Sequence, residues 1–348
     1  MIKSLTALRG IFILFIFFHH CLDLYQGGGT LAVTFFFILG GFCMTLGYKD
    51  KVLNPSFSYI KFIKGRCSKF FPLHWLCLVA SIPLVILFHA ELRQLWIFPV
   101  NALLLQSWIP IKDVYFSYNW VSWYLADTMF FSVMFPYFLR MFLTLSNKGK
   151  IVFSVLITVL YILLALLLPV EKYHSFLYIS PIIRSTDFIL GIFLAMLFLR
   201  LKENPVKWAT KTIMGQLISV VLVVLLVVES CLLPEIVTWL APVYWILVCL
   251  LILIASLSCE NGGGKFWENK LLQRLGELSF PIFLIHQLVL RYSSLIFEKL
   301  LHIDNKLIFI VFTLTVTVVL SNLVDYYILK TITQWIKRKF QTSMTALS

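Results

Sequence analysis

The chain has 348 residues, of which 60% are hydrophobic and only 13% are charged. Because a soluble domain has roughly 45–50% apolar and about 25% charged residues, most of this chain must lie in lipid or against other buried segments. The formal net charge of +13 would suit nucleic acid, but the lysines and arginines stand mainly between apolar blocks, so we expect no nucleic-acid partner.

Ten apolar blocks are each close to the ~20 residues that a helix needs to cross a membrane. In chain order they cover residues 7–25, 30–48, 70–89, 120–143, 151–170, 179–199, 212–231, 239–258, 279–298 and 306–329. A shorter block at 94–108 contains Pro99 and is not expected to span. The prediction is an all-α polytopic membrane bundle of about ten transmembrane helices, forming a single domain over residues 1–348.

The basic segments between the blocks predict how the helices are oriented. If residues 94–108 do not cross, every such segment falls on the side of Lys3, and basic loops are typically cytoplasmic. These segments are residues 49–69, 140–150, 200–211, 265–274 and 330–339. We therefore expect both termini in the cytoplasm, with a basic loop at 49–69 and a tail at 330–348. Residues 94–119 are then an outer re-entrant or interfacial segment.

The cysteines and the N-terminus suggest little chemistry of their own. The seven cysteines lie mostly within apolar runs and form no CxxC pair, so we expect neither a disulfide framework nor a metal site. Arg9 interrupts the first apolar block and no small-residue cleavage site follows it. This pattern indicates a retained membrane span rather than a signal peptide.

Polar residues form a row on one side of the first predicted helix. His20 follows Arg9 by eleven residues, which at ~100° per residue returns to within roughly 20° of the same face. Asp23 lies one turn beyond His20, within side-chain reach. Since such a row is costly in lipid, we expect it to face the bundle interior or a wet cavity. The alternative is that Arg9 reaches the headgroups and the histidines lie at the outer interface.

Other charged residues lie at similar depths in the later blocks. Arg184 and Asp187 are three residues apart, which favours a structural ion pair over direct chemistry. Asp127 lies within a predicted span, at a depth similar to that of His20. For His286, a hydrogen-bonded core position and a contact with substrate are equally reasonable interpretations. Polar groups that converge from several spans indicate one buried cavity.

Tryptophans gather near the outer boundary, which is typical of the aromatic belt of a membrane protein. Sugars also stack on such rings, so Trp120 and Trp123 are candidates for an acceptor site beside residues 94–119.

Six segments in order resemble one family of membrane enzymes. They are LTALRGIFILFIFFHH (5–20), AVTFFFILGGF (32–42), FIKGRCSKFFPLHW (62–75), NWVSWYLADTMFFSVMFP (119–136), RSTDFILGIFLA (184–195) and LGELSFPIFLIH (275–286). Together they resemble the membrane acyltransferase-3 family, whose first helix carries an arginine, ten residues and a histidine, here Arg9 and His20. The chain departs from the family pattern at Ala32, Thr34, Gly40, His74, Asp127, Phe280 and Phe283.

The resemblance implies transfer of an acyl group, usually acetyl, from cytoplasmic acyl-CoA to a hydroxyl of an extracytoplasmic polysaccharide or lipid-linked sugar. Acetyl-CoA would be a co-substrate, and no permanently bound cofactor is expected. An imidazole can act as nucleophile or general base near neutral pH, so His20 is the predicted catalytic centre. From spacing alone, Asp23 is expected to orient it. Asp127 completes the predicted catalytic set.

The cationic candidates are predicted to bind the donor. Arg9, with Arg66 and Lys69 on the cytoplasmic side, is suited to the phosphates of CoA. For Arg66 and Lys69 the alternative is ordinary positive-inside charge. Arg184, Asp187, His286, Trp120 and Trp123 are predicted to support the site or bind the acceptor.

Two other function classes stay open from the sequence. A polytopic transporter or flippase for a lipid-linked glycan or metabolite would use the intramembrane ions for substrate or proton coupling. A membrane acyltransferase that acts on lipid or protein would depend on His286 and not on His20. The expected location is the bacterial inner membrane, and the sequence leaves the oligomeric state open.

Overall fold

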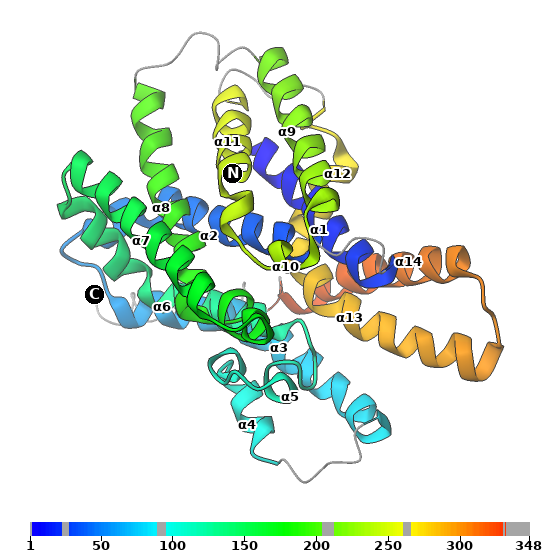
Figure 1. Ribbon diagram of the computed structural model, residues 1–348. Helices are drawn as coiled ribbons and strands as arrows, with labels where there is room; N and C mark the ends of the chain where they lie inside the picture. The colour runs from blue at the N-terminus through cyan, green and yellow to red at the C-terminus, as the bar shows by residue number, and fades with distance from the viewer. Residues whose placement is uncertain are drawn as a thin grey trace, which may run out of the picture. The chain divides into compact units, whose positions relative to one another are not determined.

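The computed structural model describes residues 2–22, 28–88, 95–203, 212–259, 266–329 and 331. Helices make up 87% of it, and the described residues contain no strand. The all-α class predicted from the apolar blocks is therefore confirmed. Figure 1 shows the helices in chain order, from blue at the N-terminus to red at the C-terminus.

Ten long helices coincide with the ten predicted blocks. They are α1 (Lys3–Leu22), α2 (Gly28–Leu53), α3 (Tyr59–Phe88), α6 (Ser122–Thr144), α7 (Asn147–Leu167), α8 (Pro181–Glu203), α9 (Thr212–Leu232), α11 (Pro242–Cys259), α13 (Ser279–Leu295) and α14 (Lys306–Val324). Within the described ranges, eight helices are long and apolar enough to cross a membrane. Of the ten, α6 is not among these eight, and α11 is a shorter apolar helix. Crossing by α6 and α11 stays a prediction.

Two expected connecting segments have a different local structure. The basic segment 49–69 is mostly helical, because α2 continues to Leu53 and α3 begins at Tyr59. The expectation of a loop there was wrong: apolarity ends at the membrane surface, whereas a helix continues wherever its backbone hydrogen bonds are satisfied. Residues 95–121 contain only the short helices α4 (Ile97–Ala102), η1 (Gln106–Trp108) and α5 (Lys112–Tyr115). The prediction that 94–108 is not a spanning helix agrees with this.

Contacts divide the chain into two compact units. The first unit contains Met1–Phe57 and Phe130–Glu277, and the second contains Ser58–Met129 and Leu278–Ser348. The boundary falls inside α6, so its first two turns belong to the second unit.

The first unit is built on close helix pairs, of which α2 with α8 is the most extensive. Glycines allow the two backbones to touch. A methyl group added at Gly41 of α2 would overlap the carbonyl oxygen of Phe188, and one added at Gly191 of α8 would overlap that of Ile38. Such reciprocal small-residue contacts are typical of helix packing in membranes. Figure 1 shows α2 in blue beside α8 in green.

Aromatic rings fill the rest of this crossing. Phe12 of α1 stacks on Phe35 of α2, with ring centroids 3.7 Å apart. Phe131 stacks on Phe188 at 5.1 Å. This fixes α1, α2 and α8 as the dry core of the first unit.

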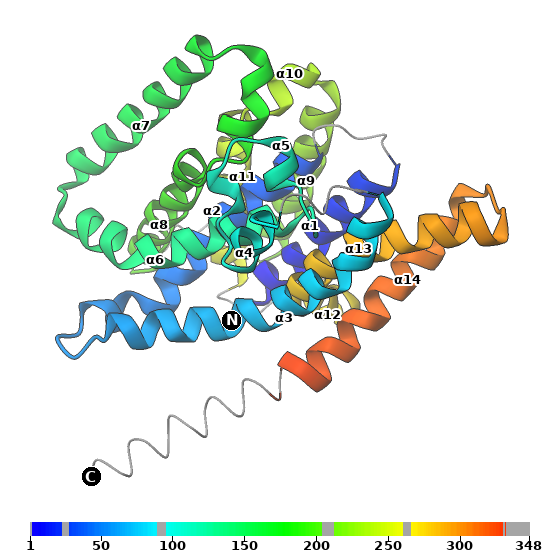
Figure 2. The ribbon, with the colours of Figure 1, turned by 90° about the horizontal axis from the view of Figure 1, so that it is seen from below.

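In the second unit, α13 contacts both α3 and α14. Figures 1 and 2 show α13 and α14 as neighbouring orange helices that form a hairpin. Its turn passes through the π-helical segment η4 (Ile296–Leu301) and His302, whose φ is 50°.

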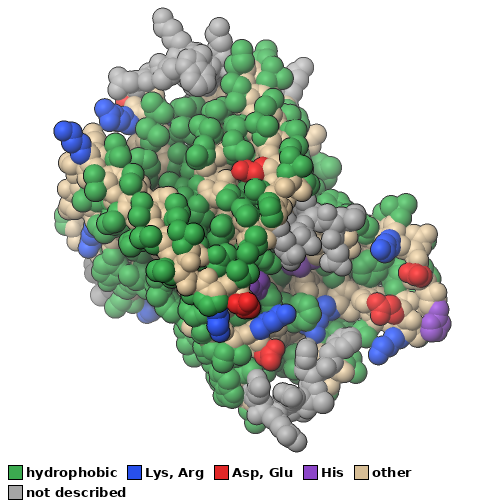
Figure 3. All heavy atoms as spheres, in the orientation of Figure 1, with side chains coloured by type: hydrophobic (Ala, Val, Ile, Leu, Met, Phe, Trp, Pro, Cys, Tyr) green, Lys and Arg blue, Asp and Glu red, His purple; other side chains and the backbone are tan. Residues whose placement is uncertain are grey.

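Several helices carry rows of exposed apolar side chains. On α7 they include Ile151, Val155, Leu156, Val159, Leu163 and Leu166, and on α14 they include Leu307, Ile308, Val311, Val319 and Leu323. The face drawn in Figure 3 is correspondingly dominated by hydrophobic side chains. A soluble monomer does not expose continuous apolar surfaces of this kind, so these helices belong in lipid. The chain is an integral multi-pass membrane protein.

Candidate active site

The α1 helix presents Arg9 and His20 outside its dry face. Arg9 is half-buried and His20 is exposed, whereas Phe12, Ile13, Ile16 and Phe17 between them are buried. Exposure of His20 fits a wet cavity or the outer interface and excludes a dry core position. Asp23, the predicted partner of His20, lies outside the described residues.

The backbone of α1 fixes the tautomer of His20. Its Nδ1 lies 2.8 Å from the carbonyl oxygen of Ile16, one turn earlier. Because a carbonyl oxygen only accepts, Nδ1 must carry the hydrogen, and the lone pair of the neutral ring is on Nε2. This main-chain contact orients the ring, and the orienting role of Asp23 stays a prediction.

His19 lies beside His20 and touches the second helix. The two rings are 5.1 Å apart, and a Cβ atom placed on Gly29 would lie 2.9 Å from the His19 Nε2. Glycine at the first turn of α2 therefore leaves room for this ring.

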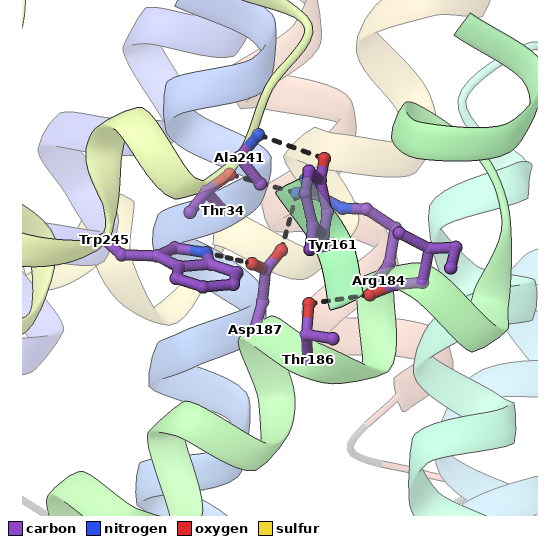
Figure 4. A network of polar contacts seen from close by, with 8 residues as sticks. Thr34, Tyr161, Arg184, Thr186, Asp187, Ala241 and Trp245 are labelled. Carbon is purple, nitrogen blue, oxygen red and sulfur yellow. Dashed lines mark hydrogen bonds and ion pairs between the residues drawn. The ribbon is translucent and has the colours of Figure 1, made fainter. Parts of the chain in front are cut away.

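The predicted pair Arg184 and Asp187 is confirmed as a buried ion pair on α8. Arg184 Nη2 lies 3.0 Å from Asp187 Oδ2, and both side chains are fully buried. Arg184 also donates to Thr34 Oγ1 at 3.1 Å, and Trp245 Nε1 donates to Asp187 Oδ1 at 2.5 Å. Figure 4 shows Trp245 and Asp187 pointing toward each other, with Thr34 and Tyr161 close by.

These partners come from helices that are distant in the sequence. Thr34 stands on α2, Tyr161 on α7 and Trp245 on α11, and Tyr161 accepts a 3.4 Å hydrogen bond from the main-chain nitrogen of Ala241. The guanidinium carbon of Arg184 lies 5.1 Å from the ring of Phe37. A carboxylate that accepts from both an arginine and an indole is compensated for burial, so the bonds of this ion pair hold α2, α8 and α11 together.

In the second unit, Asp127 and His286 stand on helices that touch. Both side chains are fully buried. The ring of Tyr124, one turn before Asp127, lies 4.6 Å from that of Phe283, one turn before His286. The Nδ1 of His286 lies 3.1 Å from the Ile282 carbonyl oxygen, so its lone pair is also on Nε2. The two predicted residues lie on adjoining surfaces of α6 and α13.

Two of the three cations predicted to bind CoA, Arg66 and Lys69, lie at one ring of α3. The guanidinium carbon of Arg66 lies 4.7 Å, and Lys69 Nζ 5.6 Å, from the centre of the Phe70 ring. Phe70 in turn packs on Phe280 of α13 at 5.6 Å. Arg66 is buried and Lys69 is exposed.

The two predicted acceptor tryptophans differ. Trp120 is 38% exposed, and the guanidinium carbon of Arg291 lies 4.7 Å from its ring centre. Trp123 is only 4% exposed. Trp120 precedes α6, whereas Trp123 stands in its first turn. An acceptor-binding role of either ring stays a prediction.

Comparison with known proteins agrees with these elements. The family model of Acyl_transf_3, an acyltransferase domain, matches residues 2–324. The chain belongs to this acyltransferase family. Acyltransferase MdmB of Streptomyces mycarofaciens is 25% identical over 289 residues, which are 76% of this chain and 69% of MdmB. No solved structure matches the chain with significance.

Family membership together with the lipid-facing helices makes this protein a membrane acyltransferase. It favours the enzyme over the transporter or flippase that the intramembrane charges alone left open. The match extends from α1 into α14, so both units belong to the acyltransferase domain.

Proposed function

We propose that this membrane acyltransferase moves an acyl group, acetyl in the simplest case, from acyl-CoA to a sugar hydroxyl. The donor is cytoplasmic, and the acceptor is a polysaccharide or lipid-linked sugar on the outer side of the bacterial inner membrane. The observation that carries the proposal is the exposed His20 ring, whose Nδ1 is bonded to the Ile16 carbonyl oxygen, which puts the lone pair of the neutral ring on Nε2.

In the proposed reaction His20 acts as a general base. Nε2 takes the proton of the acceptor hydroxyl while the hydroxyl oxygen attacks the thioester carbonyl carbon. The new C–O bond forms, the C–S bond breaks, and the thiolate of CoA leaves. The proton on Nε2 then passes to that thiolate, which returns the ring to its starting form. Atoms and charge balance without a further reactant.

Each unit carries cationic candidates for donor binding. Arg9 stands about 16 Å from His20 along the axis of α1, which separates a phosphate site from a thioester site. In the second unit, Arg66 and Lys69 of α3 form a cationic pair at the Phe70 ring. An arginine fork binds phosphate through two parallel hydrogen bonds.

The test is acyl transfer by the purified protein in nanodiscs with radiolabelled acetyl-CoA, measured as CoA release and as label in added polyols. His20→Ala should lower turnover at least ~100-fold, because general-base catalysis typically contributes that much. The matched control is His302→Asn, in the turn before α14, which should keep wild-type turnover. Full turnover in a folded His20→Ala protein would refute the role of His20.

A further inference from the structure

Residues 97–122 form an irregular segment that is tied to two helices of the second unit. His74 Nε2 of α3 lies 2.7 Å from the Asn101 carbonyl oxygen, and Trp75 Nε1 donates to that of Ala102 at 2.9 Å. On the other side, Asn119 Nδ2 donates to the carbonyl oxygen of Leu284 of α13 at 2.9 Å. The segment is therefore held on both α3 and α13.

The backbone of this segment is strained at two places. Leu104 and Tyr118 have φ values of 58° and 55° without being glycine. The Tyr118 carbonyl oxygen accepts a 2.9 Å hydrogen bond from Arg291 of α13. Non-glycine residues persist in this conformation where surrounding contacts force it, and such residues cluster at binding sites.

The segment and its two helices contain six buried polar atoms without a hydrogen-bond partner in the described part of the protein. They are His74 Nδ1, Asn101 Oδ1, Gln106 Oε1, Ser107 Oγ, Asn119 Oδ1 and Gln287 Oε1. All six side chains are at most 6% exposed. A buried polar group without a partner is costly, so such a concentration indicates a ligand.

The chemistry of these atoms is one-sided. Asn101 Nδ2 donates to the Ile97 carbonyl oxygen and to Ser117 Oγ, and Asn119 Nδ2 donates to Leu284. Main-chain carbonyl partners fix the orientation of both amides and of the His74 ring. The atoms left without a partner at these residues are therefore acceptors: Oδ1 of Asn101, Oδ1 of Asn119 and Nδ1 of His74.

A ligand for leftover acceptors must bring donors. The phosphates of CoA carry no N–H or O–H at neutral pH, so this site does not suit the phosphate groups of the donor substrate. Hydroxyl groups donate, and a sugar offers several on one small ring. Exposed rings supply apolar surface for the face of a sugar: Trp108 and Trp120 within the segment and Trp96 just before it.

We propose that this segment, with His74 and Gln287, is the binding site for the acceptor, and that it recognises a neutral polyhydroxyl ring through side-chain acceptors. This rests on the proposed function and adds the location and the recognition chemistry of the acceptor. Gln106 Nε2 donates to Ser122 Oγ at 3.0 Å, which ties this segment to the first residue of α6 as well.

The test measures how the octyl glycosides of glucose, galactose and mannose bind to the protein in nanodiscs. Tryptophan fluorescence reports the binding. Octylamine and n-octanol are the comparison ligands. At least one glycoside should bind saturably and octanol should not. Gln106→Leu should weaken that binding about tenfold, the effect of one lost hydrogen bond. Asn119→Leu is the second variant, and the affinity for acetyl-CoA should be unchanged in both.

The matched control is Thr317→Val on α14, which removes another buried hydroxyl without a partner in the described structure. It should leave glycoside binding unchanged. Equal glycoside affinity of the wild type and Gln106→Leu, preferential binding of octylamine, or no binding of any glycoside would each overturn the proposal.

The His20→Ala protein separates this inference from the proposed function. It should bind the glycoside normally and fail to transfer acetyl. If Gln106→Leu and Asn119→Leu transferred acetyl as fast as the wild type, the proposed function would stand and this site would be rejected. Binding that depends on Gln106 without any transfer from acetyl-CoA would retain the site and reject the function.

Discussion

The two units bury polar groups in opposite ways. In the first unit, charges meet charges: Arg184 and Asp187 pair on α8, and Thr34 and Trp245 complete the network. In the second unit, the N–H groups of two amides and an imidazole donate to main-chain carbonyl oxygens, and the acceptor atoms of the same side chains have no partner within the described residues. Among the atoms of the ion pair left without a hydrogen bond in the described structure, Nε and Nη1 of Arg184 are donors, whereas the second unit leaves acceptors. We interpret the ionic network as serving packing and the neutral one as serving recognition.

The largest effect that tests this comparison is loss of one partner of the ion pair. Asp187→Asn leaves the Arg184 charge buried without a carboxylate, and breaking a buried pair typically costs about 3–5 kcal/mol. The midpoint temperature of unfolding should fall by several degrees or more in this variant. Fluorescence-detected size exclusion after heating in detergent measures it.

The double variant Arg184→Met with Asp187→Leu is the matched control. Replacing both partners by apolar residues of similar volume is often neutral, so it should recover most of the stability. If it also lacked acyl transfer while being as stable as the wild type, the pair would have a direct chemical role, and the distinction between the two units would fail.

An effect of intermediate size is expected at the crossing of α2 and α8. Gly191→Ala would place a methyl group against the Ile38 carbonyl oxygen and should destabilise the protein by about 1–3 kcal/mol, because the backbones must separate. The control is Gly47→Ala, where an added Cβ meets nothing within 4 Å. It should be neutral or stabilising by about 0.5–1 kcal/mol. Equal thermal midpoints for the two variants would contradict the close crossing.

The smallest effect concerns Tyr115, in the irregular segment of the second unit. Burial raises the pKa of its phenol above the ordinary value of 10.0, and the charge of Asp113 adds to this. The folded state thus favours the neutral phenol. Its contribution to stability is present below pH 10 and is lost as the pH rises through the raised pKa.

Absorbance titration of tyrosinate should show this late-titrating phenol, and Tyr115→Phe should remove it. Asp113→Asn should move its titration to lower pH. An unchanged titration curve in Tyr115→Phe would show that the segment is more open than the structure indicates.

Sequence alone determined the helices and the local pairs. An apolar block of ~20 residues dictates a spanning helix because lipid leaves backbone groups no partners outside the helix. The spacing of Arg184 and Asp187 predicted their contact, since residues three apart share a helix face. The motifs of Arg9 with His20 and of the glycine-containing segments identified the family.

Tertiary structure decided which of these residues meet and which are exposed. No local pattern joins Trp245 to Asp187, fifty-eight residues away, or pairs Gly41 with Gly191. The same holds for His20, whose tautomer depends on the local carbonyl of Ile16 but whose exposure depends on the helices around it. Periodicity reports one helix at a time, whereas burial and leftover hydrogen-bonding groups depend on how distant helices pack.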